Sequence, residues 1–248
     1  MTNSFRQKYA IVLGASSGIG RGIARRLLAD GWFVALAARR ASLLKELCEE
    51  YPQQTLAMVI DVDAADAPEC LEALIRKLKT VDLYVHASGI GKQNQQLDRM
   101  VEQATVTTNA LGFTNMIDTV FQHMAANGGG QIAAVTSIAG TKGLGAAPSY
   151  SATKAFQNVY LEALQQLSNM RKLKIHLTDI RPGFVDTPLL AEGKYPMKME
   201  AGYATDLMVR AIYRRKHVVV VDWKYRVLTF FWRWLPHCLW RRLRIATK

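Results

Sequence analysis

Cysteine is scarce in this sequence. The three cysteines are Cys48, Cys70 and Cys238, which are far apart in the chain and form no CxxC pair. This odd number and wide spacing exclude a disulfide framework and indicate no zinc site, so we expect a protein of the reducing cytosol. The histidines also lack metal-ligand spacing, and no metal is expected. They are His86, His123, His176, His217 and His237.

Targeting signals and long apolar runs are missing as well. The N-terminal residues lead straight into a short apolar strand, with no cleavable hydrophobic region, so we expect no secretory signal. The aromatic C-terminal segment holds no uncharged apolar stretch near the ~20 residues that cross a bilayer. The chain has no repeats or Pro-rich linkers, and half of its 248 residues are hydrophobic. These features predict one compact domain with a substantial core.

Acidic residues are almost absent from the end of the chain. The formal net charge is +12, and residues 214–248 contain ten basic residues against one acid, Asp222. This segment therefore carries +9 and the rest only +3. Nucleic-acid binding is not expected, because no recognised nucleic-acid module accompanies the charge.

Short runs of apolar and β-branched residues alternate with longer segments of helical period. This alternation predicts βαβ units and a parallel sheet covered on both faces by helices. The expected strands are Tyr9–Leu13, Phe33–Ala38, Leu56–Ile60, Leu83–Ala87, Gln131–Ser137, Ile175–Ile180 and Val218–Val221. The expected helices begin near Gly18, Ser42, Ala67, Asp98, Pro148 and Met199. We therefore predict a single α/β domain over residues 1–222 and an extension over residues 223–248.

A glycine-rich turn joins the first expected strand to the first helix. Its residues are Gly14, Ala15, Ser16, Ser17, Gly18, Ile19 and Gly20. Free backbone N–H groups and the positive end of a helix at such a turn favour a bound pyrophosphate. A strand-to-helix loop without a ligand is the alternative, and the position in a βαβ unit argues against it.

Two arginines follow the second expected strand, where an NAD site usually has an acidic residue for the ribose 2′-hydroxyl. Arg39 and Arg40 would instead pair with a 2′-phosphate, so NADP(H) is the expected cofactor. The alternative is a solvated helix start, but cations are unfavourable at that end of a helix dipole.

A tyrosine and a lysine lie four residues apart at the start of the helix that begins near Pro148. Tyr150 and Lys154 therefore share one helix face, and a nearby cation is expected to lower the pKa of the phenol. Tyr150 would then be the general acid for reduction of a carbonyl, and Ser137 would donate a hydrogen bond to the substrate oxygen. Surface packing of the pair is the alternative.

These motifs, in this order, resemble those of the short-chain dehydrogenase/reductase family, and the resemblance extends to about Asp222. It implies a single Rossmann-type, doubly wound domain with a seven-stranded parallel sheet, and an NADP(H)-preferring carbonyl reductase. Asn109 matches the family's catalytic asparagine and completes a tetrad with Ser137, Tyr150 and Lys154. By this resemblance Asn109 anchors a water that joins Lys154 to solvent.

The resemblance also implies further cofactor contacts. Asp61 and Val62 match the pair that meets the adenine, and Arg181–Thr187 is similar to the segment that holds the nicotinamide. The implied cofactor-binding residues outside the glycine turn and the arginines are Asp61, Val62, Ala87, Ser88, Gly89, Tyr150, Lys154, Pro182, Gly183, Val185 and Thr187.

The chain departs from the family pattern at two places. Leu13 stands where the family usually has threonine, and His86-Ala87-Ser88-Gly89 replaces Asn-Asn-Ala-Gly. We expect weaker bracing beside the cofactor, because two amides are lost, and a buried structural role for His86.

The C-terminal extension combines aromatic and basic residues and contains four of the chain's five tryptophans. Pro236 is expected to divide it into two short helices. Two alternatives stay open and are compatible: the extension packs on the domain or between subunits, or it lies on the inner face of a membrane. Similar extensions occur in family branches that act on lipophilic substrates, which implies a lipid-like carbonyl compound.

The sequence therefore predicts an NADPH-dependent enzyme that interconverts a ketone or aldehyde and an alcohol, in either direction. A dinucleotide-binding sensor or scaffold without turnover is the alternative. The substrate pocket is expected at Ile90–Gly91, Ile138–Ala147 and Leu189–Tyr203, the last segment serving as a lid. The resemblance implies a homo-oligomer, either a dimer or a tetramer.

Overall fold

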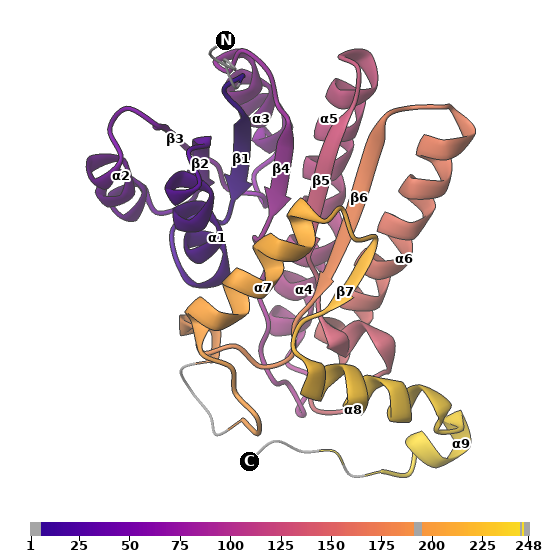
Figure 1. The fold of residues 1–248 in the computed structure, drawn as a ribbon. Coiled ribbons are helices and arrows are strands. Elements are labelled where there is room, and N and C mark those ends of the chain that lie inside the picture. Colours follow the sequence, from indigo (N-terminus) through magenta and orange to yellow (C-terminus); the bar gives the residue numbers. More distant parts are fainter. Residues whose placement is uncertain (1–5, 191–194, 244, 246–248) are drawn as a thin grey trace.

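The computed structural model describes residues 6–190, 195–243 and 245. Seven parallel strands form one sheet in the order β3-β2-β1-β4-β5-β6-β7 (Figure 1). They are β1 (Tyr9–Leu13), β2 (Phe33–Ala38), β3 (Thr55–Val59), β4 (Leu83–His86), β5 (Gly130–Val135), β6 (Ile175–Arg181) and β7 (Val218–Val220). The reversal of order beside β1 is that of a doubly wound sheet, so the predicted fold class is confirmed.

The α-helices of the described residues are α1 (Gly18–Ala29), α2 (Ala41–Glu50), α3 (Ala67–Arg76), α4 (Arg99–Val106), α5 (Phe113–Ala126), α6 (Pro148–Met170), α7 (Ala201–Tyr213), α8 (Trp223–Trp234) and α9 (His237–Trp240). Three short segments differ from α-helix: the π-helix η1 (Thr107–Gly112) and the 3-10 turns η2 (Ile138–Thr141) and η3 (Pro188–Leu190). The predicted break at Pro236 is confirmed, because α8 ends before it and α9 begins after it.

Two hydrophobic cores lie on opposite faces of the sheet. Ala10 and Val12 pack with α1, α2 and α7, whereas Ile11 and Leu13 pack with α3, α5 and α6. Successive side chains of a strand point to opposite faces, so a strand covered on both sides is apolar at every position. This explains why the strands appear in the sequence as continuous apolar runs.

All strands point the same way, so their carboxyl ends lie along one edge of the sheet (Figure 1). The glycine turn, Ala87, Ser137 and Arg181 each lie at or just beyond the carboxyl end of a strand. Helices α8 and α9 lie beyond the same edge, in yellow at the bottom of Figure 1. Parallel α/β sheets bind ligands at this edge, which makes it the place to look for a site.

Candidate active site

The turn from β1 to α1 brings the backbone very close to the loop after β4. Gly14 has φ +90°, and a Cβ there would lie 2.7 Å from the carbonyl carbon of Ala87. A Cβ on Gly20 would lie 2.2 Å from the carbonyl oxygen of Gly14. Only glycine fits at such distances, so the turn stays tight and its backbone remains open to a ligand.

A positive group lies on this turn. The guanidinium of Arg40 donates to the hydroxyl of Ser16 at 2.9 Å and to that of Ser17 at 2.5 Å. Among the residues that the structure describes, no side chain caps the first turn of α1, whose N-cap is Ser17. Arg39 is exposed at the end of β2, beside Arg40. An uncapped helix start with nearby guanidinium groups fits the phosphates of a dinucleotide.

The segment after β6 reaches the same turn. A Cβ on Gly18 would lie 3.3 Å from Cβ of Thr187, so this threonine contacts the glycine turn. On the other side, Val62 is buried against η1, and a Cβ on Gly112 would lie 2.6 Å from the carbonyl oxygen of Val62. The glycine turn, Arg40, Val62, Ala87 and Thr187, which follow the five strands β1, β2, β3, β4 and β6, therefore lie at the carboxyl edge of the sheet.

Tyr150 and Lys154 lie on the first two turns of α6, and Ser137 follows β5. The ammonium Nζ of Lys154 is 5.8 Å from the centre of the Tyr150 ring. Gly91 packs on this ring so closely that a Cβ would lie 2.6 Å from it. Ser137 Oγ accepts from the N–H of Ala139 at 3.0 Å, which orients the hydroxyl beside the phenol. The structure thus brings together three residues of the expected tetrad.

The electrostatics of Tyr150 differ from the sequence-based expectation. The pKa of the phenol is raised rather than lowered, because burial disfavours the phenolate and outweighs the opposing hydrogen bond from Ser137. Lys154 Nζ lies over the ring, and the groups that shift this pKa are the burial of the phenol and Ser137. The partly buried tyrosine is therefore held as a protonated phenol, the form that donates a proton.

Lys154 is also buried. Burial lowers its pKa to about 8, and the carboxylate of Asp179 opposes this shift. Asp179 is itself buried and is paired with Arg181, whose Nη2 lies 2.6 Å from its Oδ2. Lys154 Nζ donates to the carbonyl oxygen of Val135 at 3.2 Å, which fixes the ammonium under the end of β5.

Asn109 lies in η1 and is fully buried. Its side chain accepts from the N–H of Ile90 at 2.9 Å and donates to the carbonyl oxygen of Ile90 at 2.7 Å. A Cβ on Gly89 would lie 3.2 Å from Oδ1 of Asn109 and 3.6 Å from Lys154 Nζ. The side chain of Asn109 thus holds the loop after β4 against the tetrad.

One residue at this site was missed from the sequence. Gln157 is fully buried and joins two tetrad members: its Oε1 accepts from Lys154 Nζ at 3.0 Å, and its Nε2 donates to the Asn109 carbonyl at 2.8 Å. The amide of Gln157 therefore links the Lys154 ammonium to the backbone at Asn109, and the water that the resemblance implies between Lys154 and solvent stays a prediction. The signal was a polar residue three positions after Lys154, on the same face of the helix.

The segment after β6 depends on the C-terminal extension. A Cβ on Gly183 would lie 2.2 Å from the ring of Tyr225 in α8. The hydroxyl of Tyr225 accepts from the N–H of Phe184 at 3.1 Å and donates to the carbonyl of Met197 at 2.9 Å. The extension therefore packs on the domain here. The expected lid, Leu189–Tyr203, includes residues 191–194, which lie outside the described residues.

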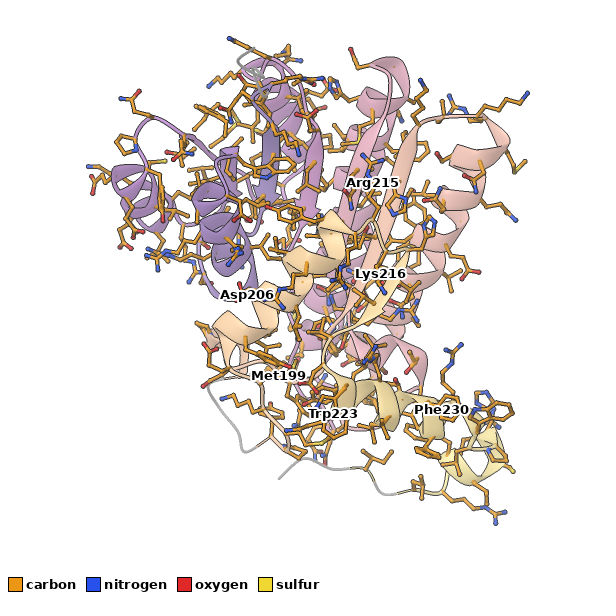
Figure 2. The ribbon with its side chains drawn as sticks, viewed as in Figure 1. Met199, Asp206, Arg215, Lys216, Trp223 and Phe230 are labelled. Carbon is orange, nitrogen blue, oxygen red and sulfur yellow. The ribbon has the colours of Figure 1, made fainter. Side chains whose placement is uncertain are left out.

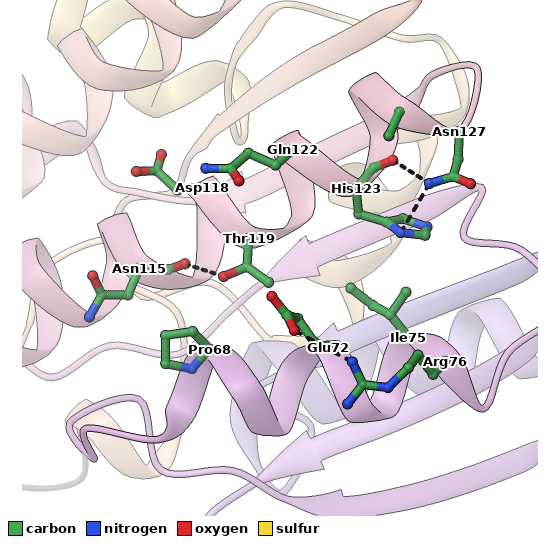
Figure 3. Close-up of a pocket in the computed structure, with 11 residues that line it drawn as sticks. Pro68, Glu72, Ile75, Arg76, Asn115, Asp118, Thr119, Gln122, His123 and Asn127 are labelled. Atoms are coloured by element: carbon green, nitrogen blue, oxygen red, sulfur yellow. Dashed lines mark hydrogen bonds and ion pairs between the residues drawn. The ribbon is translucent and has the colours of Figure 1, made fainter.

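A surface depression of about 480 Å³ lies elsewhere, between α3 and α5 (Figure 3). Its lining includes Glu72, Arg76 and His123, and it contains none of the sequence-predicted site residues. Both helices contribute polar side chains that bond within their own helix, such as Asn127 to the carbonyl of His123. The depression therefore carries none of the chemistry described above.

The chain is similar to known proteins over most of its length. A family model described as short chain dehydrogenase matches residues 8–196. An uncharacterized oxidoreductase of Myxococcus xanthus is 34% identical over 247 residues, which is 95% of this chain and 97% of that protein.

Two solved structures share the fold. A short chain dehydrogenase from Burkholderia cenocepacia, in complex with NADP, superposes with a TM-score of 0.84 at 22% identity, covering 97% of this chain and 98% of that one. A 3-ketoacyl-(acyl-carrier-protein) reductase from Brucella melitensis, complexed with NADH, gives 0.76 at 24% identity, covering 87% and 96%. The sheet, the family match and the relative together establish that this chain is an oxidoreductase of the short-chain dehydrogenase/reductase family.

Proposed function

We propose that the protein is an NADPH-dependent enzyme that interconverts a ketone or aldehyde and an alcohol, with Tyr150 as the proton donor in reduction. The observation that carries this proposal is the partly buried Tyr150, whose raised pKa keeps the phenol protonated and which lies with the buried Lys154 and Ser137 at the carboxyl edge of the sheet. Acid catalysis needs a proton held beside the position where charge develops on the substrate oxygen.

The family fold implies a nicotinamide dinucleotide, which when bound supplies or accepts the hydride. The residues of this chain manage the proton and the charge. Ser137 Oγ and the Tyr150 hydroxyl offer two hydrogen bonds to one substrate oxygen, and Tyr150 gives up its proton as that oxygen gains charge. The ammonium of Lys154, 5.8 Å from the centre of the Tyr150 ring, favours the phenolate that remains, because it is an opposite charge close to the one that forms.

Preference for NADPH rests on the two arginines after β2. Arg40 is already held over the glycine turn by Ser16 and Ser17, and Arg39 adds a second guanidinium. The segment Phe33–Arg40 contains no acidic residue that would accept from a ribose 2′-hydroxyl. The solved relatives with bound cofactor are of both kinds, one with NADP and one with NADH, so the preference depends on these arginines.

The test of the cofactor is a fluorescence titration of the purified protein with NADPH and with NADH. We expect NADPH to bind more tightly than NADH. Arg39→Ala and Arg40→Ala should each weaken NADPH binding by roughly tenfold, which corresponds to a loss of about 1.4 kcal/mol of charge pairing with the 2′-phosphate. The binding of NADH should stay nearly unchanged. Equal losses for the two nucleotides would contradict the 2′-phosphate role.

The test of the reaction is oxidation of NADPH in the presence of aldehydes, quinones and long-chain 3-keto compounds. We expect Tyr150→Phe to reduce turnover by at least a hundredfold while NADPH still binds, because only the proton donor is removed. Turnover equal to that of the unchanged protein would exclude Tyr150 as the donor. Tight binding with no consumption of NADPH by any carbonyl compound would favour the sensor or scaffold alternative.

A further inference from the structure

Helix α8 exposes a continuous apolar face. At about 100° per residue, five large apolar side chains fall within an arc of about 100° on this helix. They are 48–76% exposed, and they are Trp223, Val227, Phe230, Phe231 and Trp234. Four of them, with Arg226, line a surface groove of about 440 Å³. Figure 2 shows Trp223 and Phe230 on this helix, beyond the carboxyl edge of the sheet.

The exposed face is not the one that packs on the protein. Tyr225 and Thr229 are buried and lie on the opposite side of α8, and Trp232 beside them stacks edge-on against Trp240. Trp240 in turn donates to the carbonyl of Gly143 at 2.7 Å. Helix α8 is therefore apolar on two opposite faces. One face anchors it to the domain, and the other is not covered by the described part of the chain.

Cations flank the open face on both sides. Arg226 and Arg233 lie along one margin and Lys224 along the other, and all three are exposed. Arg241 and Arg242 follow α9 and are also exposed. Residues 223–248 contain no aspartate or glutamate. Two copies of this face packed together would bring the cations of both copies into proximity, so charge favours an anionic partner over a second copy.

We propose that the outer face of α8 binds the surface of an anionic lipid bilayer, with the helix axis parallel to the membrane plane. The five apolar side chains would enter the boundary between headgroups and acyl chains, where tryptophan is favoured. The arginine and lysine stems lie along the same apolar surface, and their charged ends reach the lipid phosphates. The contact is peripheral, since none of the described helices is long and apolar enough to cross a membrane.

This surface adjoins the candidate active site. Tyr225 on the inner side of α8 contacts Gly183 and Phe184, and Lys142, just after η2, donates to the carbonyl of Leu235 at 3.0 Å. A bilayer bound to α8 would therefore lie beside the segments expected to form the substrate pocket. The proposal does not require turnover, and its test is independent of activity.

The test is co-sedimentation of the full chain with two kinds of vesicle, one of phosphatidylcholine and one containing one third phosphatidylglycerol. We expect at least tenfold tighter binding to the anionic vesicles, and weaker binding at high salt. Equal binding to the two vesicles, or no binding to either, would overturn the proposal.

Point variants locate the surface. Phe231→Ser/Trp234→Ser should weaken vesicle binding at least tenfold, and Arg226→Glu/Arg233→Glu should abolish the preference for anionic vesicles. The matched control is Val59→Ser/Met170→Ser, which removes two exposed apolar side chains away from α8 and should leave binding unchanged. Circular dichroism and melting confirm that each variant is folded.

Two results would contradict the location. One is vesicle binding that both α8 variants leave unchanged. The other is that the unchanged protein binds no vesicles, while Phe231→Ser/Trp234→Ser lowers its molecular mass in solution. That result would identify the outer face of α8 as a contact between copies of the chain. Removal of residues 223–248 is a poorer test, because it would also uncover the contacts of Tyr225 and Trp240 with the domain.

Discussion

At the scale of single residues, His86 shows how an unusual side chain is accommodated. It is buried between Tyr84, whose hydroxyl lies 3.1 Å from its Nδ1, and Phe113, which meets it edge-on. Burial, together with the charge of Lys154, lowers the pKa of His86 to about 3. The folded protein therefore stabilises the neutral form of the His86 ring.

This pKa predicts a loss of stability in acid. The folded protein keeps His86 neutral down to about pH 3, whereas the unfolded chain takes up a proton near pH 6.5. Stability is thus lost as the pH falls from 6.5 toward 3, and the loss from this residue is roughly 3 kcal/mol at pH 4.5. Urea unfolding at pH 7 and pH 4.5 measures it. His86→Gln should lose correspondingly less, and a variant with the same acid loss would assign the effect to other groups.

Gln157 is expected to control the charge of Lys154. Its Oε1 accepts from the ammonium and so favours the charged form, against the burial that brings the pKa to about 8. Gln157→Leu should lower this pKa further and move the alkaline limb of the pH–rate profile to lower pH, whereas Gln157→Glu should move it to higher pH. Shifts in opposite directions distinguish a positioning role from simple loss of packing. If both variants keep the pH–rate profile of the unchanged protein, Gln157 does not control the charge of Lys154.

At the scale of elements, the helix expected from Asp98 onward is three segments. Helix α4 ends at Val106, the wider π-helical turn η1 holds Asn109, and α5 begins at Phe113. A π-helical turn changes which carbonyl groups the helix itself uses, and such turns are frequent at functional sites. Here the Asn109 carbonyl receives the amide of Gln157. In this turn a backbone carbonyl therefore bonds a side chain of the candidate active site.

The close contact between α8 and the segment after β6 predicts that one added methyl group at Gly183 destabilises the protein. Gly183→Ala would place a Cβ 2.2 Å from the Tyr225 ring, so it should lower the free energy of unfolding by about 1–3 kcal/mol, the usual cost of overpacking. In the background of Tyr225→Ala the same substitution should cost little, because the ring is gone. A double-mutant cycle by urea unfolding measures this coupling. Equal costs in the two backgrounds would show that the strain arises elsewhere.

At the scale of the whole molecule, the expected homo-oligomer stays a prediction, and a second exposed apolar surface supports it. Met100 and Val106 on α4, Leu111 in η1, and Phe156 and Val159 on α6 are exposed. These elements pack together, so the residues belong to one side of the domain.

We expect the protein to be at least a dimer through this side. Val159→Glu should reduce the molecular mass to that of a monomer, because it buries a charge in an apolar contact. Light scattering after gel filtration measures the mass, and Val59→Glu on the edge strand β3 is the matched control. A monomeric starting protein would disprove the expectation.

The sequence alone determined the sheet and most helix starts. Burial on both faces makes a parallel strand apolar at every position, and glycine and proline mark the turns, so β1 and β2 have the predicted bounds and α1, α3 and α6 begin at the predicted residues. The other strand ends differ by one or two residues, because pairing with a neighbouring strand sets where a strand stops.

Only the tertiary structure decided the electrostatics and the contacts across the fold. The direction of the Tyr150 pKa shift depends on how far packing removes the phenol from water, and this does not follow from the spacing of four residues between Tyr150 and Lys154. Gln157 bonds the carbonyl of Asn109, which is 48 residues away in the sequence. Tyr225 packs on Gly183, which is about 40 residues away. Local periodicity reports which face of an element is apolar, whereas the partner that meets each face is set only when distant segments pack together.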